Sequence, residues 1–448
     1  MTEKSSSARY FGGMRRRLVF GAISAVAASL LVGCSSGGGS PSQTLVVQTQ
    51  GDPASFQQVA KAFEEQNKGV TVKLQNVTNE QKITTNGQVM AGNNAPDVGI
   101  VPLNAQSYTD LVKADALLPL DDVWKDADLA SRYGAATAES LKTKGTPYLV
   151  LFDRVFYNTV FYNQDAFAAA GVTVPENHQI SSNEELFKIV AALKSKGYEG
   201  VATGGNSGYK WGWLLDGQLQ ANATKSSLDN LTTSWQPGQQ QTVKYTDSEF
   251  TDSVLQLKNW YDNRVFPEGV LAQSDDQSQA LFTSGKAAML LGGSFTPSVL
   301  DQQKPSFKYD WLLLPGAGDS KATIPTVYAG DTFAVSKKAK NPDLAKKFLK
   351  FFLQDDMQTE RAKTSGQLPA VDTVDPSSIP SLNPQVQSIV SFVQAKGSGT
   401  GWTSVVPGSI GQSVFDPQLQ KVLSGAQTVE QLAKNQQQQF EEFTSKNG

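Results

Sequence analysis

Along most of this chain, segments with the hydrophobic pattern of a strand alternate with segments that have the pattern of a helix. The uninterrupted apolar run Leu45–Val47 is typical of a strand that is buried on both faces. Apolar residues then recur at i, i+3, i+4 and i+7 through residues 56–63, which indicates an amphipathic helix. Residues 70–74 alternate with the period of a second strand, and residues 98–101 supply a third. The pattern predicts strand–helix–strand units at the start of the folded region.

The same rhythm continues to the C-terminus. One helix is predicted to have Asp52 as its N-cap and Pro53 as its first residue. A second is predicted to begin at Asn183 and to end at Gly197. Three more are predicted around residues 250–261, from Asn341-Pro342 and from about Thr428. Further strands are predicted at residues 148–152, 155–162, 311–314 and 332–335. Residues 282–289 are interpreted as a helix end, a glycine stop at Gly285 and a buried strand. The run Gln436–Gln439 in the last helix is predicted to face solvent. Alternating elements predict an α/β fold with mainly parallel sheets, in which ligands bind beyond the carboxyl ends of the strands.

The N-terminal region has the features of an export signal. Arg15–Arg17 precede an apolar run, Leu18–Gly33, that is too short to span a bilayer core of about 30 Å. The small residue before Cys34, the only cysteine, resembles the end of a bacterial lipobox, in which the cysteine is lipidated. A lipidated Cys34 would hold the protein at the outer face of the cytoplasmic membrane. An ordinary signal peptide with an incidental cysteine is the alternative.

These features divide the chain into three parts. Residues 1–33 are predicted to be the lipoprotein signal peptide, and residues 34–43 the lipidated cysteine with a flexible tether. Translation from Met14 instead of Met1 stays open. Removing residues 1–33 from the 448 leaves 415 residues, which exceed a single core and predict two domains.

A single histidine and a single cysteine limit the chemistry that this chain can carry. They exclude disulfides, metal sites rich in histidine or cysteine and most histidine-dependent catalysis, so neither a metal nor a cofactor is expected. The net charge of −3 at pH 7 gives no general attraction for nucleic acid. The loop Gly316–Lys321 lacks the spacing of a phosphate-binding loop, and the lone histidine, His178, is predicted to lie on the surface.

Several short segments together resemble one protein family. They are Asn94–Val98, Leu117–Asp121, Tyr162–Asp165, Phe282–Met289, Gly292–Phe295, Ala329–Lys337 and Asn341-Pro342. In this order they are similar to the extracellular solute-binding proteins of carbohydrate ABC importers, the group that contains the maltose-binding protein. The resemblance covers nearly the whole chain after the leader, and it is specific for the family but not for the substrate.

The resemblance implies a two-lobed periplasmic-binding-protein fold with the ligand in the cleft between the lobes. Each lobe would be a mainly parallel sheet flanked by helices, and crossing strands would form a hinge. The crossings are expected near residues 151–155, 326–331 and 385–400. Lobe 1 would then comprise residues 44–152 plus 328–390, and lobe 2 residues 153–327 plus 391–448.

The resemblance also implies a set of ligand-binding residues. A sugar presents C–H faces that pack on aromatic rings, and hydroxyls that need paired donors and acceptors. The implied residues are Asp52, Asn104, Asp153, Arg154, Trp211, Trp213, Phe295, Tyr328, Gly330, Asp331 and Trp402. Trp402 is predicted to be exposed by its glycine neighbours, and Asp331 is the leading acidic candidate.

Each candidate also has a structural alternative. Asp52 can serve only as a helix cap, Arg154 can brace the hinge through a salt bridge, and the tryptophans can pack in the core. Asn104 stands where the family often has an acid, and Phe295 where it often has tryptophan. Both differences weaken the transfer of a binding role to these two positions.

The predicted function is capture of a sugar, and of an oligosaccharide in particular, by hinge closure, without catalysis. The expected partners are a mono- or oligosaccharide, the permease subunits of an ABC importer and the membrane through the lipid anchor, with the protein itself a monomer. Two alternatives stay open. The solute can be a polyol, a polyamine or a peptide, or the protein can be a secreted glycoside hydrolase with a carboxylate pair.

Overall fold

The computed structural model describes residues 43–51, 53–133, 135–236, 238–316, 322–328 and 331–447. All of them lie within one unit, Pro41–Gly448. The predicted leader, Cys34, Asp52 and Gly330 lie outside the described residues. Within the described part, no helix is both long and apolar enough to cross a membrane.

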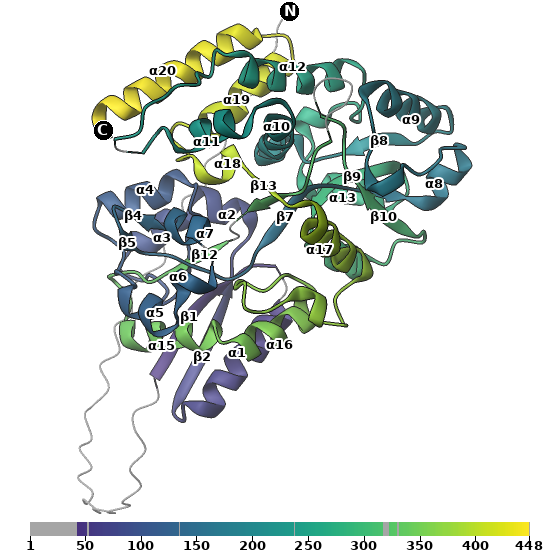
Figure 1. The fold of residues 1–448 in the computed structure, drawn as a ribbon. Coiled ribbons are helices and arrows are strands. Elements are labelled where there is room, and N and C mark those ends of the chain that lie inside the picture. The colour runs from purple at the N-terminus through teal and green to yellow at the C-terminus, as the bar shows by residue number, and fades with distance from the viewer. Residues whose placement is uncertain are drawn as a thin grey trace, which may run out of the picture. The chain divides into compact units, whose positions relative to one another are not determined.

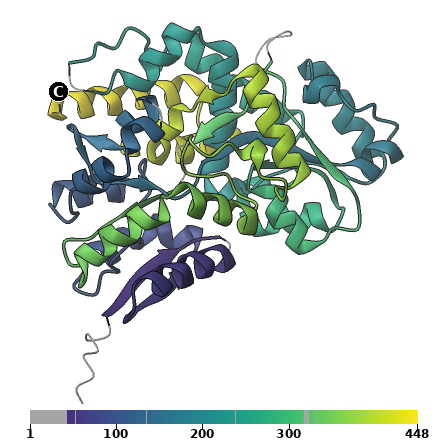
Figure 2. The same cartoon turned by 60° about the horizontal axis from the view of Figure 1, so that its bottom comes forward.

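A first hydrophobic core contains the N-terminal strands. β1 (Gln43–Thr49) pairs in parallel with β2 (Val70–Asn76), and α1 (Pro53–Gln66) connects them, as the sequence predicts. The other helices around this core are α2 (Asn79–Thr84), α3 (Asn86–Ala91), α4 (Gln106–Lys113), α5 (Asp121–Asp126), α6 (Leu129–Arg132), α7 (Ala135–Ser140), α15 (Pro342–Phe352) and α16 (Asp355–Ser365). In Figure 2, α15 and α16 (green) lie beside α1 and β2 (purple). Phe56 of α1 stacks on Phe352 of α15, so segments far apart in the chain share this core.

A three-stranded sheet completes this core. β12 (Thr332–Ala334) lies between β3 (Gly99–Ile100) and β6 (Val150–Leu151) and runs antiparallel to both. The short strands β4 (Lys142–Thr143) and β5 (Thr146–Pro147) form a separate antiparallel pair. β3, β6 and β12 are shorter than the strands predicted at residues 98–101, 148–152 and 332–335.

The second sheet is built around β7 (Val155–Asn163), and its apolar side chains join two further hydrophobic cores. Its other strands are β8 (Glu199–Ala202), β9 (Ala287–Gly293), β10 (Tyr309–Leu312), β11 (Thr326–Tyr328) and β13 (Gly399–Thr400). The order is β13–β11–β7–β9–β8, and β10 also pairs with β7. All seven residues of β9 are buried, which confirms the buried strand predicted after Gly285.

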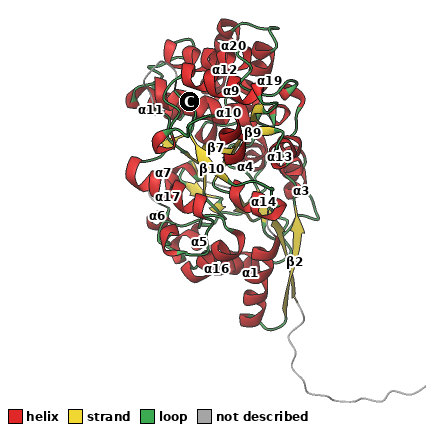
Figure 3. Cartoon of the chain, turned by 90° about the vertical axis from the view of Figure 1, so that its right-hand side faces the viewer, coloured by secondary structure: helices red, strands yellow, loops and turns green. Residues whose placement is uncertain are grey.

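Helices cover this second sheet, as Figures 1 and 3 show. They are α8 (Gln164–Ala169), α9 (Asn183–Ser195), α10 (Tyr209–Asn222), α11 (Lys225–Thr233), α12 (Ser248–Asp262), α13 (Asp275–Thr283), α14 (Thr296–Gln303), α17 (Pro384–Lys396), α18 (Trp402–Val405), α19 (Gln412–Leu423) and α20 (Val429–Asn447). Short 3₁₀ helices occupy Glu176–His178, Gly205–Ser207, Val270–Ala272 and Pro376–Ser378.

The chain passes between the two sheets on paired strands. β6 continues into β7, and β11 returns beside it into β12, with Tyr328 opposite Val155 and Thr332 opposite Leu151. A strand that returns beside the outgoing strand must run antiparallel to it. The prediction of mainly parallel sheets is therefore wrong, since only the β1–β2, β8–β9 and β11–β13 pairs of the named strands are parallel. The α/β fold class itself is confirmed.

Three local predictions also need correction. The N-cap of α9 is Ser182, whose side chain accepts a hydrogen bond from the Glu185 N–H, and not Asn183. Gln436 and Gln437 are buried because α20 packs against α12 and α19, and their side-chain nitrogens donate to the Ile410 carbonyl and the Gln241 side chain. His178 is half-buried, because its ring stacks on Trp311 with centroids 4.1 Å apart.

Candidate functional site

Four aromatic side chains meet on the second sheet close to the crossing strands. The indole of Trp213 stacks on the ring of Tyr157, with centroids 4.8 Å apart and an interplanar angle of 27°. Tyr209 and Phe295 approach the same indole edge-on, with centroid distances of 5.1 and 6.2 Å. We call Tyr157, Tyr209, Trp213 and Phe295 the ring cluster. Tyr157 is buried and the other three are half-buried, so the cluster keeps some apolar surface open.

Local sequence explains how the ring cluster is held. Tyr209 and Trp213 lie one turn apart on α10, so their side chains share a face of that helix. Phe295 follows β9 directly, as the N-cap of α14. Gly293 allows this close approach, because a Cβ there would lie 2.8 Å from the carbonyl oxygen of Phe156 and 3.0 Å from the Phe295 ring.

A buried cation lies against these rings. The Lys210 ammonium is 4.1 Å from the ring centre of Trp213, 5.3 Å from that of Tyr209 and 5.7 Å from that of Phe295. The side chain is only 5 % exposed. Burial lowers the pKa of Lys210, and the negative charge of Asp275 partly offsets that effect. Contact with aromatic faces stabilises an ammonium that has left water.

Two carboxylates stand at the crossing itself. Asp331 accepts hydrogen bonds from the Lys82 ammonium at 2.7 and 2.9 Å, and its own N–H donates to Asp153 at 3.1 Å. Burial raises the pKa of Asp153 to about 6, although the nearby Arg361 charge acts in the opposite direction. Burial and the charges of Asp331 and Asp153 raise the pKa of Tyr328 well above its ordinary value. The Tyr328 hydroxyl therefore stays protonated at neutral pH.

The negative charge of Asp331 also acts on Tyr209 of the ring cluster. Burial, the Asp275 carboxylate and, more weakly, Asp331 all raise the pKa of Tyr209. The hydroxyl of Tyr209 donates to Asp275 at the start of α13. Tyr328 lies opposite Val155, two positions from Tyr157 on β7, so the charged groups at the crossing stand near the ring cluster.

A polar network links this site to a contact between the two cores. Asp216 accepts hydrogen bonds from the Tyr157 hydroxyl at 2.7 Å and from the Thr403 N–H at 3.0 Å. The Thr403 carbonyl in turn accepts from the Asn104 side chain at 3.0 Å. Gly401 keeps room for the network, because a Cβ there would lie 2.0 Å from the Tyr157 hydroxyl. Asn104 therefore joins the segment after β3 to α18, next to the second sheet.

Asp216 is expected to make stability depend on pH. Burial raises the pKa of Asp216 to about 7, whereas in the unfolded chain it titrates near 4. Between these values the folded protein holds a proton that the unfolded chain has released, so the free energy of unfolding falls as pH rises from about 4 to about 7. Asp216→Asn should reduce this slope in urea unfolding measured at pH 4.5, 6 and 7.5.

The slope that remains in Asp216→Asn is assigned to Asp153 and Asp416, whose pKa values burial also raises. The exposed carboxylate of Asp229 provides a matched control, since Asp229→Asn should leave the slope unchanged. An Asp216→Asn profile that is parallel to the wild-type profile would show that Asp216 does not titrate in this interval.

Two predicted tryptophans lie in the core. Trp402 is 0 % exposed, donates to the Tyr245 hydroxyl at 3.0 Å and packs against Phe250, so the prediction that its glycine neighbours expose it is wrong. Trp211 is also 0 % exposed and donates to the Gly205 carbonyl at 2.9 Å. α10 turns Trp211 away from Trp213, because residues two positions apart point to different sides of a helix.

The predicted residues at the crossing have different neighbours. Arg154 contacts the carbonyls of Pro369 and Val371 and forms an ion pair with Asp372, which matches the alternative in which it braces the hinge. Asp153 and Asp331 lie together, because the Asp331 N–H donates to the Asp153 side chain.

Sequence reasoning missed five residues of the site: Tyr157, Tyr209, Lys210, Asp216 and Lys82. Tyr209 and Lys210 stand beside the predicted tryptophans, so the helical period through 209, 213 and 216 was the available signal. Lys82 lies 249 positions before Asp331, and no local pattern relates them.

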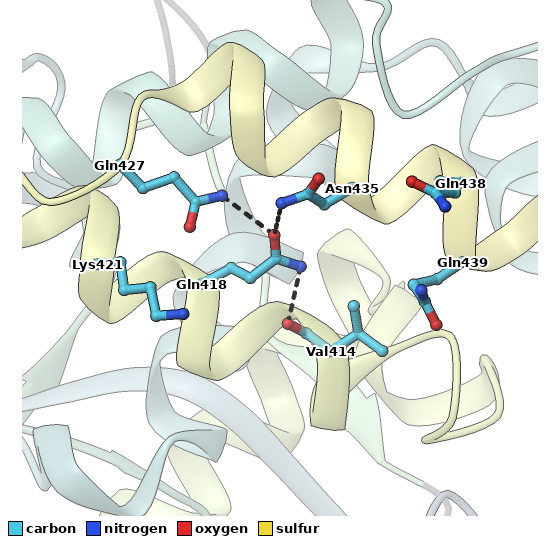
Figure 4. Close-up of a pocket in the computed structure, with 7 residues that line it drawn as sticks. All are labelled: Val414, Gln418, Lys421, Gln427, Asn435, Gln438 and Gln439. Carbon is cyan, nitrogen blue, oxygen red and sulfur yellow. Dashed lines mark hydrogen bonds between the residues drawn. The ribbon is translucent and has the colours of Figure 1, made fainter.

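A groove between α19 and α20 has a volume of about 290 Å³ (Figure 4). Five amide side chains, Lys421 and Val414 line it. The Gln418 side-chain oxygen already accepts from Gln427 and Asn435. The groove has no aromatic face, so it is a poorer match for a sugar than the ring cluster. Among the described residues, no group of three or more His, Cys, Asp or Glu side chains is placed to hold a metal ion.

A family model described as bacterial extracellular solute-binding protein matches residues 48–359, more than half of the chain. The chain belongs to this family. This solute-binding protein is 26 % identical over 325 residues to a binding protein of Brucella abortus, a match that covers 70 % of this chain and 72 % of the relative.

Solved structures give the same fold. A chitin oligosaccharide binding protein matches with a TM-score of 0.74 and 23 % identity, covering 90 % of this chain and 99 % of that one. An ABC transporter solute-binding protein from Thermotoga lettingae, bound with α-D-tagatose, matches with a TM-score of 0.75 and 16 % identity, covering 90 % of this chain and 100 % of that one. The two-lobed periplasmic-binding-protein architecture is thereby confirmed.

Proposed function

We propose that this solute-binding protein captures a saccharide at the ring cluster and delivers it unchanged to the permease of an ABC importer. The observation that carries the proposal is the meeting of partly open aromatic rings with the hydrogen-bonding groups of Asp331, Asp153 and Tyr328. A sugar needs both kinds of contact. The saccharide ligands named for the two solved structures of the same fold support this choice of solute.

The proposed ligand contacts are a subset of the residues implied by the family resemblance. They are Asn104, Asp153, Trp213, Phe295, Tyr328 and Asp331, together with Asp52 and Gly330, which lie outside the described residues. Arg154 is proposed to hold the hinge instead of the ligand. Trp211 and Trp402 are left out because they pack in the core.

Hinge closure is the proposed mechanism of capture. The paired strands β6–β7 and β11–β12 would form the hinge, with lobe 1 at residues 44–152 plus 328–390 and lobe 2 at residues 153–327 plus 391–448. The hydrophobic cores support this division, because one draws on residues 45–152 and 333–390. α17 lies at the proposed boundary, since Val386 belongs to that core and Ile389 to another. A ligand that touches both lobes only when they close would shift the equilibrium toward the closed form.

Membership of an extracellular family supports the proposed location outside the cytoplasmic membrane. Lipidation of Cys34 is the proposed anchor, and the protein is proposed to act as a monomer without catalysis. Mass spectrometry of the membrane fraction tests the anchor, because acylated Cys34 should be the N-terminal residue of the mature chain.

A thermal-shift screen tests the proposed solute. The panel would contain mono- and oligosaccharides, polyols, polyamines and short peptides. A saccharide present at 100 times its Kd should stabilise the fold by about 2.7 kcal/mol and raise the melting temperature. Stabilisation by a polyamine or peptide alone would contradict the proposal. Chromatography of the bound saccharide after incubation should recover it intact, whereas shorter products would identify a hydrolase.

A further inference from the structure

Both faces of the Trp213 indole are covered in this structure. Tyr157 stacks on the indole at 4.8 Å, and the Lys210 ammonium lies 4.1 Å from the indole centre. Two rings 4.8 Å apart leave no room for an ammonium between them, so Lys210 covers the face opposite Tyr157. A sugar ring can therefore stack on Trp213 only after Lys210 has moved.

The Lys210 ammonium makes few hydrogen bonds in its observed position. Its ammonium has three donors, and the described structure gives it one hydrogen bond, to the Leu291 carbonyl at 3.4 Å. The side chain is 5 % exposed, so water does not fully replace the missing partners. No carboxylate among the described residues lies within ion-pair distance of this ammonium. A buried charge held mainly by aromatic faces is costly unless another state gives it a better partner.

A carboxylate with a free oxygen borders the same small cavity. Lys210, Leu291, Phe295 and Asp275 line a space of about 10 Å³, enough for about one water molecule. One Asp275 oxygen accepts from the Tyr209 hydroxyl, while the other, Oδ1, is buried and has no hydrogen-bond partner. Lys210 and Asp275 thus border one water-sized space, and each has hydrogen-bonding capacity that is not used in this structure.

We propose that Lys210 is a displaceable internal ligand of the ring cluster. When a saccharide enters, its C–H face replaces the ammonium on Trp213, and the ammonium turns toward Asp275. This inference rests on the proposed saccharide function and adds the determinant of its selectivity. Neutral, hydroxyl-rich solutes are accepted, whereas polyamines are disfavoured, because the displaced Lys210 ammonium stays beside the ring cluster and repels a second cation there.

Three variants test the exchange by calorimetric titration with the saccharide that gives the largest thermal shift. Lys210→Met keeps the length of the side chain and removes its charge, so no ammonium has to be displaced, and the saccharide should bind about 3- to 10-fold more tightly. Asp275→Asn keeps an oxygen for Tyr209 but offers the ammonium no charge, so affinity should fall about 5- to 10-fold. In Lys210→Met/Asp275→Asn, the second substitution should have no effect.

Matched controls separate this exchange from a general change of charge. Asp276→Asn removes a charge from the same first turn of α13, and Lys308→Met removes an exposed ammonium. Both should bind the saccharide like the wild type. Urea unfolding of each variant confirms that it is folded at the temperature of the titration.

The outcomes distinguish the inference from the function on which it rests. Unchanged or weaker binding by Lys210→Met overturns the displacement while leaving saccharide capture intact. An equal loss from Asp275→Asn with and without Lys210 overturns it too. Saccharide binding by Lys210→Met but not by the wild type supports the exchange. If neither the wild type nor Lys210→Met binds any saccharide, the proposed function and this inference both fail.

Discussion

Replacing Trp402 with alanine is expected to lower the free energy of unfolding by about 3–5 kcal/mol. The indole is 0 % exposed, and Tyr245, Phe250 and Phe415 surround it. Its removal leaves a cavity that these rings cannot refill, and it also leaves the Tyr245 hydroxyl without its indole donor. Urea unfolding followed by circular dichroism measures the effect.

Trp235 provides the control for Trp402, because it is half-buried at the edge of the same core. Trp235→Ala should cost less than half as much stability as Trp402→Ala. If Trp402→Ala kept wild-type stability but bound the saccharide much more weakly, Trp402 would belong to the ligand site and not to the core.

Replacing Trp213 with alanine is expected to weaken saccharide binding by about 2 kcal/mol, or roughly 30-fold. The substitution removes the ring around which Tyr157, Tyr209 and Phe295 are arranged. Stability should change by only about 1 kcal/mol, because Trp213 is half-buried and does not belong to the neighbouring hydrophobic core. Isothermal titration gives the affinity, and urea unfolding gives the stability.

The pair Trp211→Ala and Trp213→Ala makes this prediction specific. Trp211 is two positions away on α10 but packs in the core beside Phe266. Trp211→Ala should strongly destabilise the protein, whereas Trp213→Ala should strongly reduce the affinity for the saccharide. Similar losses of affinity in both variants, at equal stability, would place the site elsewhere.

The fold was predictable where the pattern is local. The apolar period of residues 56–63 gave α1, and the uniformly apolar segment after Gly285 gave β9. Strand direction was not predictable, because whether β12 runs parallel to β6 depends on a crossing that brings residues 151 and 332 together. Periodicity contains no information about such long-range pairing.

The site was predictable only in part, because local sequence shows which helix is rich in aromatic residues but not how that helix is oriented. The aromatic density at 209–213 pointed to the correct helix, but which tryptophan faces the rings depends on the rotation of α10 against β7. The prediction for Trp402 is wrong because glycine neighbours do not by themselves indicate exposure. Gly401 is instead required by the close approach of Tyr157 and Asp216. Glycine next to an aromatic residue therefore indicates either exposure or tight packing, and sequence alone does not distinguish them.

Fluorine NMR of protein labelled with 5-fluorotryptophan tests the central claim most directly. The seven tryptophans give separate resonances that single Trp→Phe substitutions assign. On titration with the best saccharide, the Trp213 resonance should shift most, while those of buried Trp211 and Trp402 stay nearly fixed. A shift confined to other tryptophans, or no shift at saturation, would contradict a saccharide site at the ring cluster.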